Sequence, residues 1–304
     1  MKLFVWNINQ IGGYRIPRLI ATEILESNPD IVVLTECLNV SDEKKMNIIQ
    51  EFIAGPLNDK YKIHYNLESR VCSGDHGVLI AVKKSADGQF VSNSMSEATI
   101  ISKIEKMNTV RKEQPDFLQI DMFVNGELLS VIGTKIRATD YVKRHEQLLS
   151  LIDHIKTLGN KNILVAGNFS NGYIHGEEHE FYIGENNARE NYRLKEKALH
   201  DTFNYHMMKD DFYDIGMKLS TPYGEQYSSG FEINEDGYPN DGYLKEDHVL
   251  TTRTLSAGNL RYSHQFMKKG NGEWSIKPPF PNHSILTATI FLKGIERIIH
   301  AETR

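Results

Sequence analysis

The sequence predicts an α/β protein built as a two-sheet sandwich with helices on the outside. Stretches typical of strand, helix and strand alternate at the front of the chain, hairpin strands follow, and strands return near the end. A doubly wound sheet would alternate strand and helix throughout, so this mixed order favours two sheets. We expect one domain over residues 1–304, because no repeat, low-complexity tract or obvious linker interrupts the chain.

The first elements form a strand–helix–strand unit. Residues 3–7 and 30–36 predict buried strands, the second of which ends in a carboxylate. Between them, apolar residues at helical spacing predict a helix that begins near Pro17 and ends near Asn28. The same patterns then predict a helix from Ser41 and strands over 61–65 and 77–82.

A hairpin and a long helix occupy the middle of the chain. Asn125-Gly126 is the strongest short hairpin signal available, and it joins strands predicted over 117–124 and 127–133. One apolar stripe predicts a helix over 141–158, with Gly159 as its stop. The remaining predictions are a buried strand from Ile163, helices over 192–208 and 211–219, a loop over 224–244, and strands over 248–252 and 284–292.

Composition narrows the functional classes. A chain with 40% hydrophobic and 25% charged residues has ordinary soluble composition. Its net charge of −5 gives no general attraction to nucleic acid or anionic membrane, so a nucleic-acid ligand would need a local basic groove. Two cysteines favour a reducing compartment, and neither a signal peptide nor a long apolar run occurs. We expect a cytoplasmic monomer that does not insert into membranes.

Polar side chains end several predicted strands. Asn7 and Glu36 end the two parallel strands of the first unit, so we expect them to lie side by side as the kind of oxygen ligands that Mg²⁺ prefers. Taken singly, a strand-end Asn is usually a turn residue and a strand-end Glu is usually only solvated. Asn168, Asp247 and His283 lie at later strand ends, and an ordered set of this kind is much less expected by chance.

These motifs resemble, in order, those of the endonuclease/exonuclease/phosphatase superfamily. The resemblance extends from Leu3 to about Leu292, and its specificity comes from the order of short motifs. It implies a four-layer α/β/β/α sandwich of two mixed sheets flanked by helices, with the site at the mouth between the sheets. It also implies phosphoester hydrolysis by in-line attack of water, with Mg²⁺ or Mn²⁺ as the cofactor. The motifs are Trp-Asn-Ile-Asn at 6–9, Thr-Glu at 35–36, Gly-Thr-Lys at 133–135, Gly-Asn-Phe-Ser-Asn-Gly at 167–172, Glu-Asp-His-Val-Leu at 246–250 and Asn-His-Ser-Ile-Leu at 282–286.

The resemblance assigns roles to the unchanged residues. Asn7 and Glu36 match the metal ligands of the superfamily. His283 matches the histidine that donates to the scissile phosphate, and Asp247 matches the acid that raises the pKa of that histidine and fixes its tautomer. The alternative, that Asp247 and His248 form the terminal pair themselves, is disfavoured because a strand-like stretch and Asn282-His283 still follow.

The sequence departs from the resemblance at positions where the superfamily has catalytic or metal-binding residues. Asn168 replaces an Asp that would orient or deprotonate the attacking water, and Ser170 replaces an Asn that would hold the phosphate or nucleophile. Asn282 replaces an Asp that would assist the metal, and Lys135 lies where many members have His. An amide keeps the shape of a carboxylate but not its charge or basicity, and losing a general base typically costs about 10²–10⁴-fold in rate.

Two hypotheses about function follow. The first is an Mg²⁺-dependent phosphoester hydrolase of reduced activity, acting on nucleic acid or on a small phosphorylated molecule. The second is an inactive relative that binds a phosphorylated ligand as a regulatory module. Asn168 and Asn282 are either natural replacements or engineered Asp→Asn changes, and the sequence ranks neither explanation first. The polar stretch 173–246 is expected to shape specificity.

Overall fold

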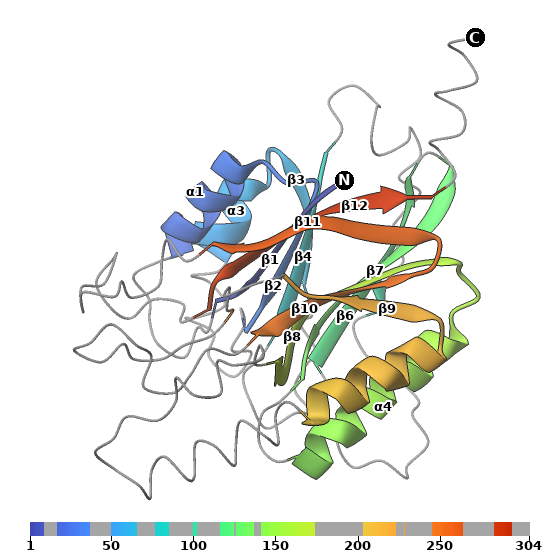
Figure 1. Ribbon diagram of the computed structural model, residues 1–304. Helices are drawn as coiled ribbons and strands as arrows, with labels where there is room; N and C mark the ends of the chain where they lie inside the picture. The colour runs from blue at the N-terminus through green and yellow to red at the C-terminus, as the bar shows by residue number, and fades with distance from the viewer. Residues whose placement is uncertain are drawn as a thin grey trace, which may run out of the picture.

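The computed structural model describes residues 1–8, 17–36, 50–65, 77–84, 100–101, 116–124, 126–136, 141–173, 203–222, 228, 245–263 and 283–293. Their strands form two six-stranded mixed sheets that lie face to face, with helices on both outer faces (Figure 1). The predicted four-layer α/β/β/α sandwich is confirmed. No helix among the described residues is both long and apolar enough to cross a membrane.

The first sheet contains both ends of the described chain. Its central strand β1 pairs in parallel with β2 and antiparallel with β12. The sheet order is β11 (Leu255–Ser263), β12 (Ile285–Leu292), β1 (Lys2–Asn7), β2 (Ile31–Thr35), β4 (Val78–Lys83) and β3 (Tyr61–Tyr65).

The second sheet is built from the middle of the chain. Its strands β7 and β8 are parallel, and β10 runs antiparallel beside β8. The sheet order is β5 (Ile100–Ile101), β6 (Asp116–Val124), β7 (Glu127–Lys135), β8 (Asn162–Tyr173), β10 (Lys245–Thr252) and β9 (Met217–Ser220).

Alternation along the strands separates three layers of apolar packing. In β1, Leu3 and Val5 join the core between the two sheets, whereas Phe4 and Trp6 lie in the core under the helices of the first sheet. This separation follows from the two-residue period of a strand, which sends successive side chains to opposite faces. Strands buried on both faces need apolar residues at nearly every position, as β2 has (Ile31–Thr35).

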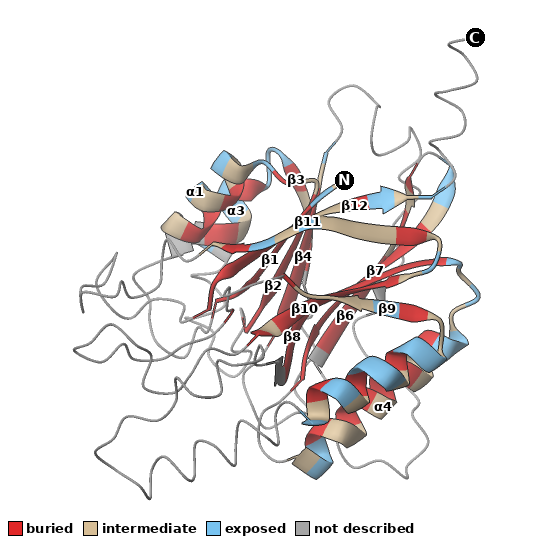
Figure 2. Ribbon diagram, in the orientation of Figure 1, coloured by how far each residue is buried: buried red, intermediate tan, exposed pale blue. Residues whose placement is uncertain are grey.

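Helices cover each sheet on its outer side. The first sheet is covered by α1 (Pro17–Ser27), a π-helical turn over Gln50–Ala54 and the short α3 (Gly55–Leu57). The second is covered by α4 (Tyr141–Thr157) and by a helix over 203–214, drawn in orange beside α4 in Figure 1. Figure 2 shows the solvent face of this pair in pale blue and the strands beneath in red, as an amphipathic helix on a sheet requires.

Each sheet contains one strand–helix–strand unit with parallel strands. In β1–α1–β2, Asn7 lies opposite Thr35, and the N–H of Ile8 donates to the Thr35 carbonyl at 3.0 Å. In β7–α4–β8, Lys135 lies opposite Asn168, and the N–H of Ile136 donates to the Asn168 carbonyl at 2.9 Å. The two units therefore end in the same local backbone arrangement, with side chains of different chemistry.

One predicted helix is wrong. Residues 211–219 were expected to be helical, but the helix ends at residue 214 and Met217–Ser220 forms β9. Gly216, at a φ of +79°, turns the chain out of the helix, and Leu219 then pairs with Leu250 of β10. Pairing with a neighbouring strand overrides the local helical pattern here.

Other predictions for the polar stretch fall partly outside the described residues. The helix from Ser41, residues 192–202 and most of the 224–244 loop are not among them. Within the stretch 173–246, residues 203–220 belong to the second sheet and its outer layer.

Candidate functional site

Predicted site residues from both sheets meet at the ends of the two parallel strand pairs. The first sheet supplies Asn7, Glu36 and His283, and all of them are buried. His283 and Glu36 keep slight exposure, 5% and 7%, whereas Asn168 and Asp247 are fully buried. The second sheet supplies Lys135, Asn168, Ser170 and Asp247. Asn282 lies outside the described residues.

Asp247 and His283 form an ion pair across the two sheets. The Nδ1 of His283 lies 2.8 Å from the Oδ2 of Asp247, and the indole N–H of Trp6 donates to the His283 carbonyl at 3.0 Å. Burial alone would lower the pKa of His283, but the charge of Asp247 and the hydrogen bond to it outweigh burial and raise that pKa. The Asp247 carboxylate thus favours the cationic form of the imidazole, whose Nδ1 faces it.

His248 occupies a different place from His283. Its Nδ1 lies 3.1 Å from the hydroxyl of Thr221, and its ring packs against Phe169 and Tyr205. Those neighbours belong to the apolar layer under the outer helices of the second sheet. The alternative terminal pair of Asp247 with His248 therefore does not match this geometry.

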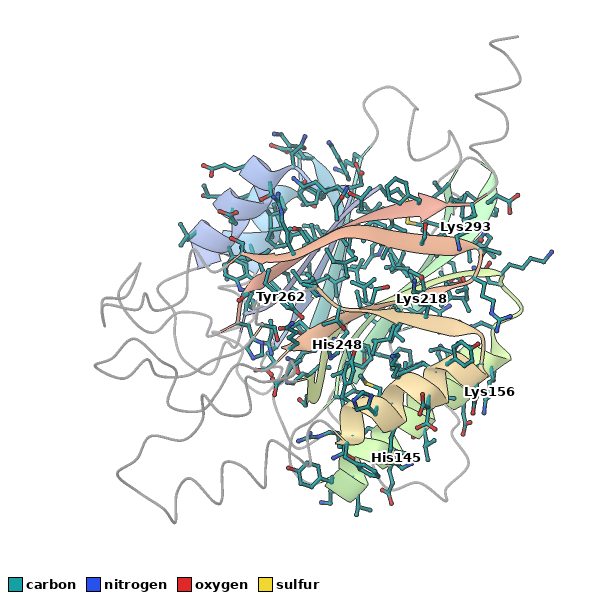
Figure 3. The ribbon with its side chains drawn as sticks, viewed as in Figure 1. His145, Lys156, Lys218, His248, Tyr262 and Lys293 are labelled. Carbon is teal, nitrogen blue, oxygen red and sulfur yellow. The ribbon has the colours of Figure 1, made fainter. Side chains whose placement is uncertain are left out.

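Two residues that the sequence did not single out hold Asp247 in place. The hydroxyl of Ser228 accepts the backbone N–H groups of Glu246 at 2.6 Å and Asp247 at 3.2 Å. The hydroxyl of Tyr262, whose pKa burial and the Asp247 charge raise well above its ordinary value, donates to the Asp247 carbonyl at 2.6 Å. Figure 3 shows Tyr262 and His248 at the same end of the sandwich. No short motif marks either Ser228 or Tyr262, so only the fold reveals them.

Among the described residues, the Oδ1 of Asp247 is a buried oxygen without a hydrogen-bond partner. A buried carboxylate oxygen without a partner is costly, and such atoms often accept from a water or ligand in the working protein. The Asp247 carboxylate therefore offers a second acceptor beside the cationic imidazole.

Lys135 connects the two sheets through its ammonium group. Its Nζ lies 2.8 Å from the Oε1 of Glu36, and it donates to the Oδ1 of Asn168 at 2.6 Å and to the hydroxyl of Ser170 at 3.2 Å. The Asn168 oxygen also accepts the backbone N–H of Ser170 at 3.1 Å. Asn168 is therefore fixed as an acceptor for a cation, a role that an amide oxygen performs without any negative charge.

Backbone strain marks both sides of the site. Glu36 and Ser170 have φ values of 55° and 49°, in the left-handed region that side chains other than Gly rarely adopt. Gly167 has a φ of +147°, and a Cβ there would lie 2.0 Å from the Thr134 carbonyl oxygen. Strain of this kind persists only where the surrounding structure holds it, and it is concentrated at functional sites.

The described residues do not fit a bound divalent cation. Glu36 accepts the amide N–H of Asn7 at 3.1 Å through the same Oε1 that contacts Lys135, so a metal would meet an ammonium there. Asp247 is paired with His283, and Asn168 carries no charge. No group of three or more His, Cys, Asp and Glu side chains within the described ranges is arranged to hold a metal ion. Mg²⁺ usually requires carboxylate oxygens in near-octahedral geometry.

Comparison with known proteins connects this chain to solved structures through its fold. No protein-family model and no curated protein matches it by sequence. An AP endonuclease from Archaeoglobus fulgidus gives a TM-score of 0.59 at 13% identity, over 95% of this chain and 98% of that one. An endonuclease/exonuclease/phosphatase from Bacteroides vulgatus gives 0.57 at 11% identity, over 96% and 98%.

A third similar structure was solved with a ligand. The D. rerio TDP2 complexed with a single-strand DNA product gives a TM-score of 0.53 at 12% identity, over 96% of this chain and 98% of that one. At such identities the likeness is one of architecture. This chain therefore shares the fold of the endonuclease/exonuclease/phosphatase from Bacteroides vulgatus and of the AP endonuclease from Archaeoglobus fulgidus.

Proposed function

We propose that this chain is a phosphoester hydrolase of low turnover that acts at the Asp247–His283 end of the sandwich. The observation that carries the proposal is a pair of adjacent donors. The Nε2 of His283 lies 3.4 Å from the Nδ2 of Asn7, and the carboxylate of Glu36 fixes that amide nitrogen in place. When His283 is protonated at both ring nitrogens, it places a second donor beside the Nδ2 of Asn7, where a phosphoryl oxygen is a suitable acceptor.

The protein's own residues support a limited form of this chemistry. A charge-assisted donor such as His283 stabilises negative charge that develops on a phosphoryl group, and Asp247 keeps it oriented and cationic. Asn168 does not act as a base, since it is an amide whose oxygen already accepts from Lys135 and Ser170. We therefore expect turnover about 10²–10⁴-fold below that of a site with a general base. The Mg²⁺ implied by the resemblance supplies no step here, because the donor set does not fit it.

Hydrolysis of bis-p-nitrophenyl phosphate, p-nitrophenyl phosphate and a single-stranded DNA oligonucleotide tests the proposal. The wild type should release product slowly, and His283→Ala should lower the rate by at least about 10²-fold. His145→Ala, on α4 and labelled in Figure 3, is the matched control and should leave the rate unchanged. No product from any substrate, or equal rates in the wild type and His283→Ala, would contradict hydrolysis at this site.

A second candidate function is binding of a phosphorylated ligand without cleavage. The specific observation that favours it is the fixed Asn168 oxygen, which belongs to an amide and does not act as a base. In that case calorimetry would show binding of the same phosphoesters, weakened by His283→Ala, with no product after prolonged incubation. Phosphoester binding together with product formation would instead favour the hydrolase.

A further inference from the structure

We propose that the ammonium of Lys135 permanently takes the place of a divalent cation, so that the site binds phosphoryl groups without metal. This inference rests on the proposed function only in its choice of ligand. It concerns the charge on Glu36, whose carboxylate lies beside Asn7 and Lys135 at the strand ends.

Three oxygens from three residues surround the Lys135 ammonium. They are Oδ1 of Asn168, Oε1 of Glu36 and Oγ of Ser170, at 2.6, 2.8 and 3.2 Å from Nζ. A lysine ammonium has three N–H donors and no acceptor, so these oxygens match its capacity. The side chain is also 92% buried, since its relative exposure is 8%. Lys135 therefore acts as a fixed part of the site, in contrast to a solvated surface lysine.

The Lys135 ammonium offsets the charge of Glu36 without any added ion, and Asp247 is paired with His283. A phosphoryl group that reaches Asn7 therefore meets a Glu36 carboxylate whose repulsion a cation already offsets. In a metal-dependent site, the metal ion removes this repulsion.

Asn168 and Lys135 depend on each other in this arrangement. An Asp at position 168 would place Lys135 between two carboxylates, which would leave one negative charge for a metal ion to offset. With Asn168 the oxygen remains as an acceptor at 2.6 Å but the charge is gone, so one ammonium is enough. Asn168 and Lys135, both departures from the resemblance, therefore change the charge of the site together: one removes a negative charge and the other supplies a positive one.

A divalent ion would have to compete directly with Lys135. To bind Glu36 it would need to displace the ammonium from Oε1, which would leave a buried lysine beside a second cation. Burying a charge without its partner is strongly unfavourable. We therefore expect the wild type to bind divalent metal weakly and Lys135→Met to bind it more tightly.

Two binding measurements on the full chain test this inference. Mn²⁺ binding is followed by electron paramagnetic resonance, and inorganic phosphate binding by calorimetry with EDTA present. The wild type should bind phosphate equally with and without EDTA. Lys135→Met should lose about tenfold in phosphate affinity in EDTA and gain about tenfold in Mn²⁺ affinity, because Glu36 without its cation repels phosphate and attracts the metal ion. Lys156→Met, at a lysine on α4 with a 56% exposed side chain, should match the wild type in both.

A double variant keeps the test valid if Lys135→Met is unstable. Lys135→Met with Glu36→Gln removes both charges of the pair, so it leaves no buried carboxylate unpaired and should not gain Mn²⁺ affinity. A wild type that binds Mn²⁺ as tightly as Lys135→Met, or that binds phosphate only when metal is present, would overturn the inference.

The two proposals fail separately in these measurements. Phosphate binding in EDTA without any phosphoester turnover would sustain the role of Lys135 and reject the hydrolase. If the wild type bound no phosphate under any condition, metal-free phosphoryl binding would be overturned. Mn²⁺ affinity would then still show whether Lys135 blocks the cation position.

Discussion

The β1–α1–β2 and β7–α4–β8 units have the same backbone arrangement at their ends and opposite charges on their side chains. Asn7 faces Thr35 in the first unit as Lys135 faces Asn168 in the second, and the next residue donates to the same carbonyl in both. The first unit ends in the carboxylate of Glu36, whereas the second ends in the ammonium of Lys135. These charges meet at 2.8 Å and join the two units.

This difference shows that strand pairing sets the position of a site residue in each unit. The type of side chain at that position can differ between the two units. Asn7 and Glu36 in the first unit are the residues that the resemblance predicts. The described departures, Lys135, Asn168 and Ser170, all belong to the second unit.

The largest expected effect comes from breaking the backbone of the second unit. Gly167→Ala should lower the free energy of unfolding by about 3 kcal/mol or more, because its Cβ would lie 2.0 Å from the Thr134 carbonyl oxygen. Urea denaturation measures the loss. Gly126→Ala is the control: its φ is +81° but nothing lies within 4 Å of the added Cβ, so about 1 kcal/mol is expected. Equal losses would show that the close approach at Gly167 is unimportant.

Removing the charge of Asp247 should have the next largest effect, and the effect should depend on pH. The folded-state pKa of His283 lies above its ordinary value of 6.5, so the pair contributes stability fully below pH 6.5 and loses it as pH rises through the folded pKa. Asp247→Asn should therefore cost about 1–3 kcal/mol at pH 6 and less at pH 9.

Denaturation of Asp247→Asn at both pH values, with NMR titration of His283, checks this expectation. The titration should show that the pKa of His283 falls, because burial is then no longer outweighed by the charge and hydrogen bond of Asp247. Asp153→Asn, in an exposed pair with Lys156, should change stability by about 0.5 kcal/mol or less. A loss that grows with pH would contradict the assigned charge on His283.

The third largest effect is expected when a residue of the second unit is changed to the one that the superfamily has at that position. Asn168→Asp adds a carboxylate 2.6 Å from the Lys135 ammonium and supplies a base beside the donors of His283. We expect phosphoester turnover to rise by about tenfold or more. Initial rates with bis-p-nitrophenyl phosphate measure it, with Asn160→Asp, outside the site, as the control. Unchanged turnover would indicate that Lys135 keeps the new carboxylate from acting as a base.

The smallest effect is expected at the equivalent position of the first unit. Thr35 lies opposite Asn7 as Asn168 lies opposite Lys135, yet its hydroxyl is buried with no hydrogen-bond partner among the described residues. Thr35→Val should therefore change the free energy of unfolding by less than about 1 kcal/mol, in either direction, by thermal denaturation. A loss of several kcal/mol would reveal a partner for the hydroxyl.

Much of the fold was predictable because local patterns and strand order agree. The Asn125-Gly126 signal predicted the hairpin of β6 and β7, and the apolar stripe predicted α4 to within one residue at its end. Residues 211–219 show where this agreement fails, because β9 exists only through pairing with β10.

The sequence predicted which residues form the site better than it predicted the contacts between them. Strand-end positions predicted that Asn7 and Glu36 lie side by side, and the resemblance implied that Asp247 pairs with His283. That Lys135 pairs with Glu36 depends on the stacking of two sheets, for which the sequence carries no local signal. Ser228 was equally hidden, since no short motif marks a serine whose hydroxyl accepts backbone N–H groups of β10.

The Glu36–Lys135 pair also has a consequence for the order of folding. Each strand–helix–strand unit closes through contacts that are near in sequence, whereas this pair forms only when the two finished sheets stack. Contacts that form late influence the unfolding rate more than the folding rate. The site would thus be the last part of the sandwich to assemble, and a ligand bound there would lengthen the lifetime of the native state.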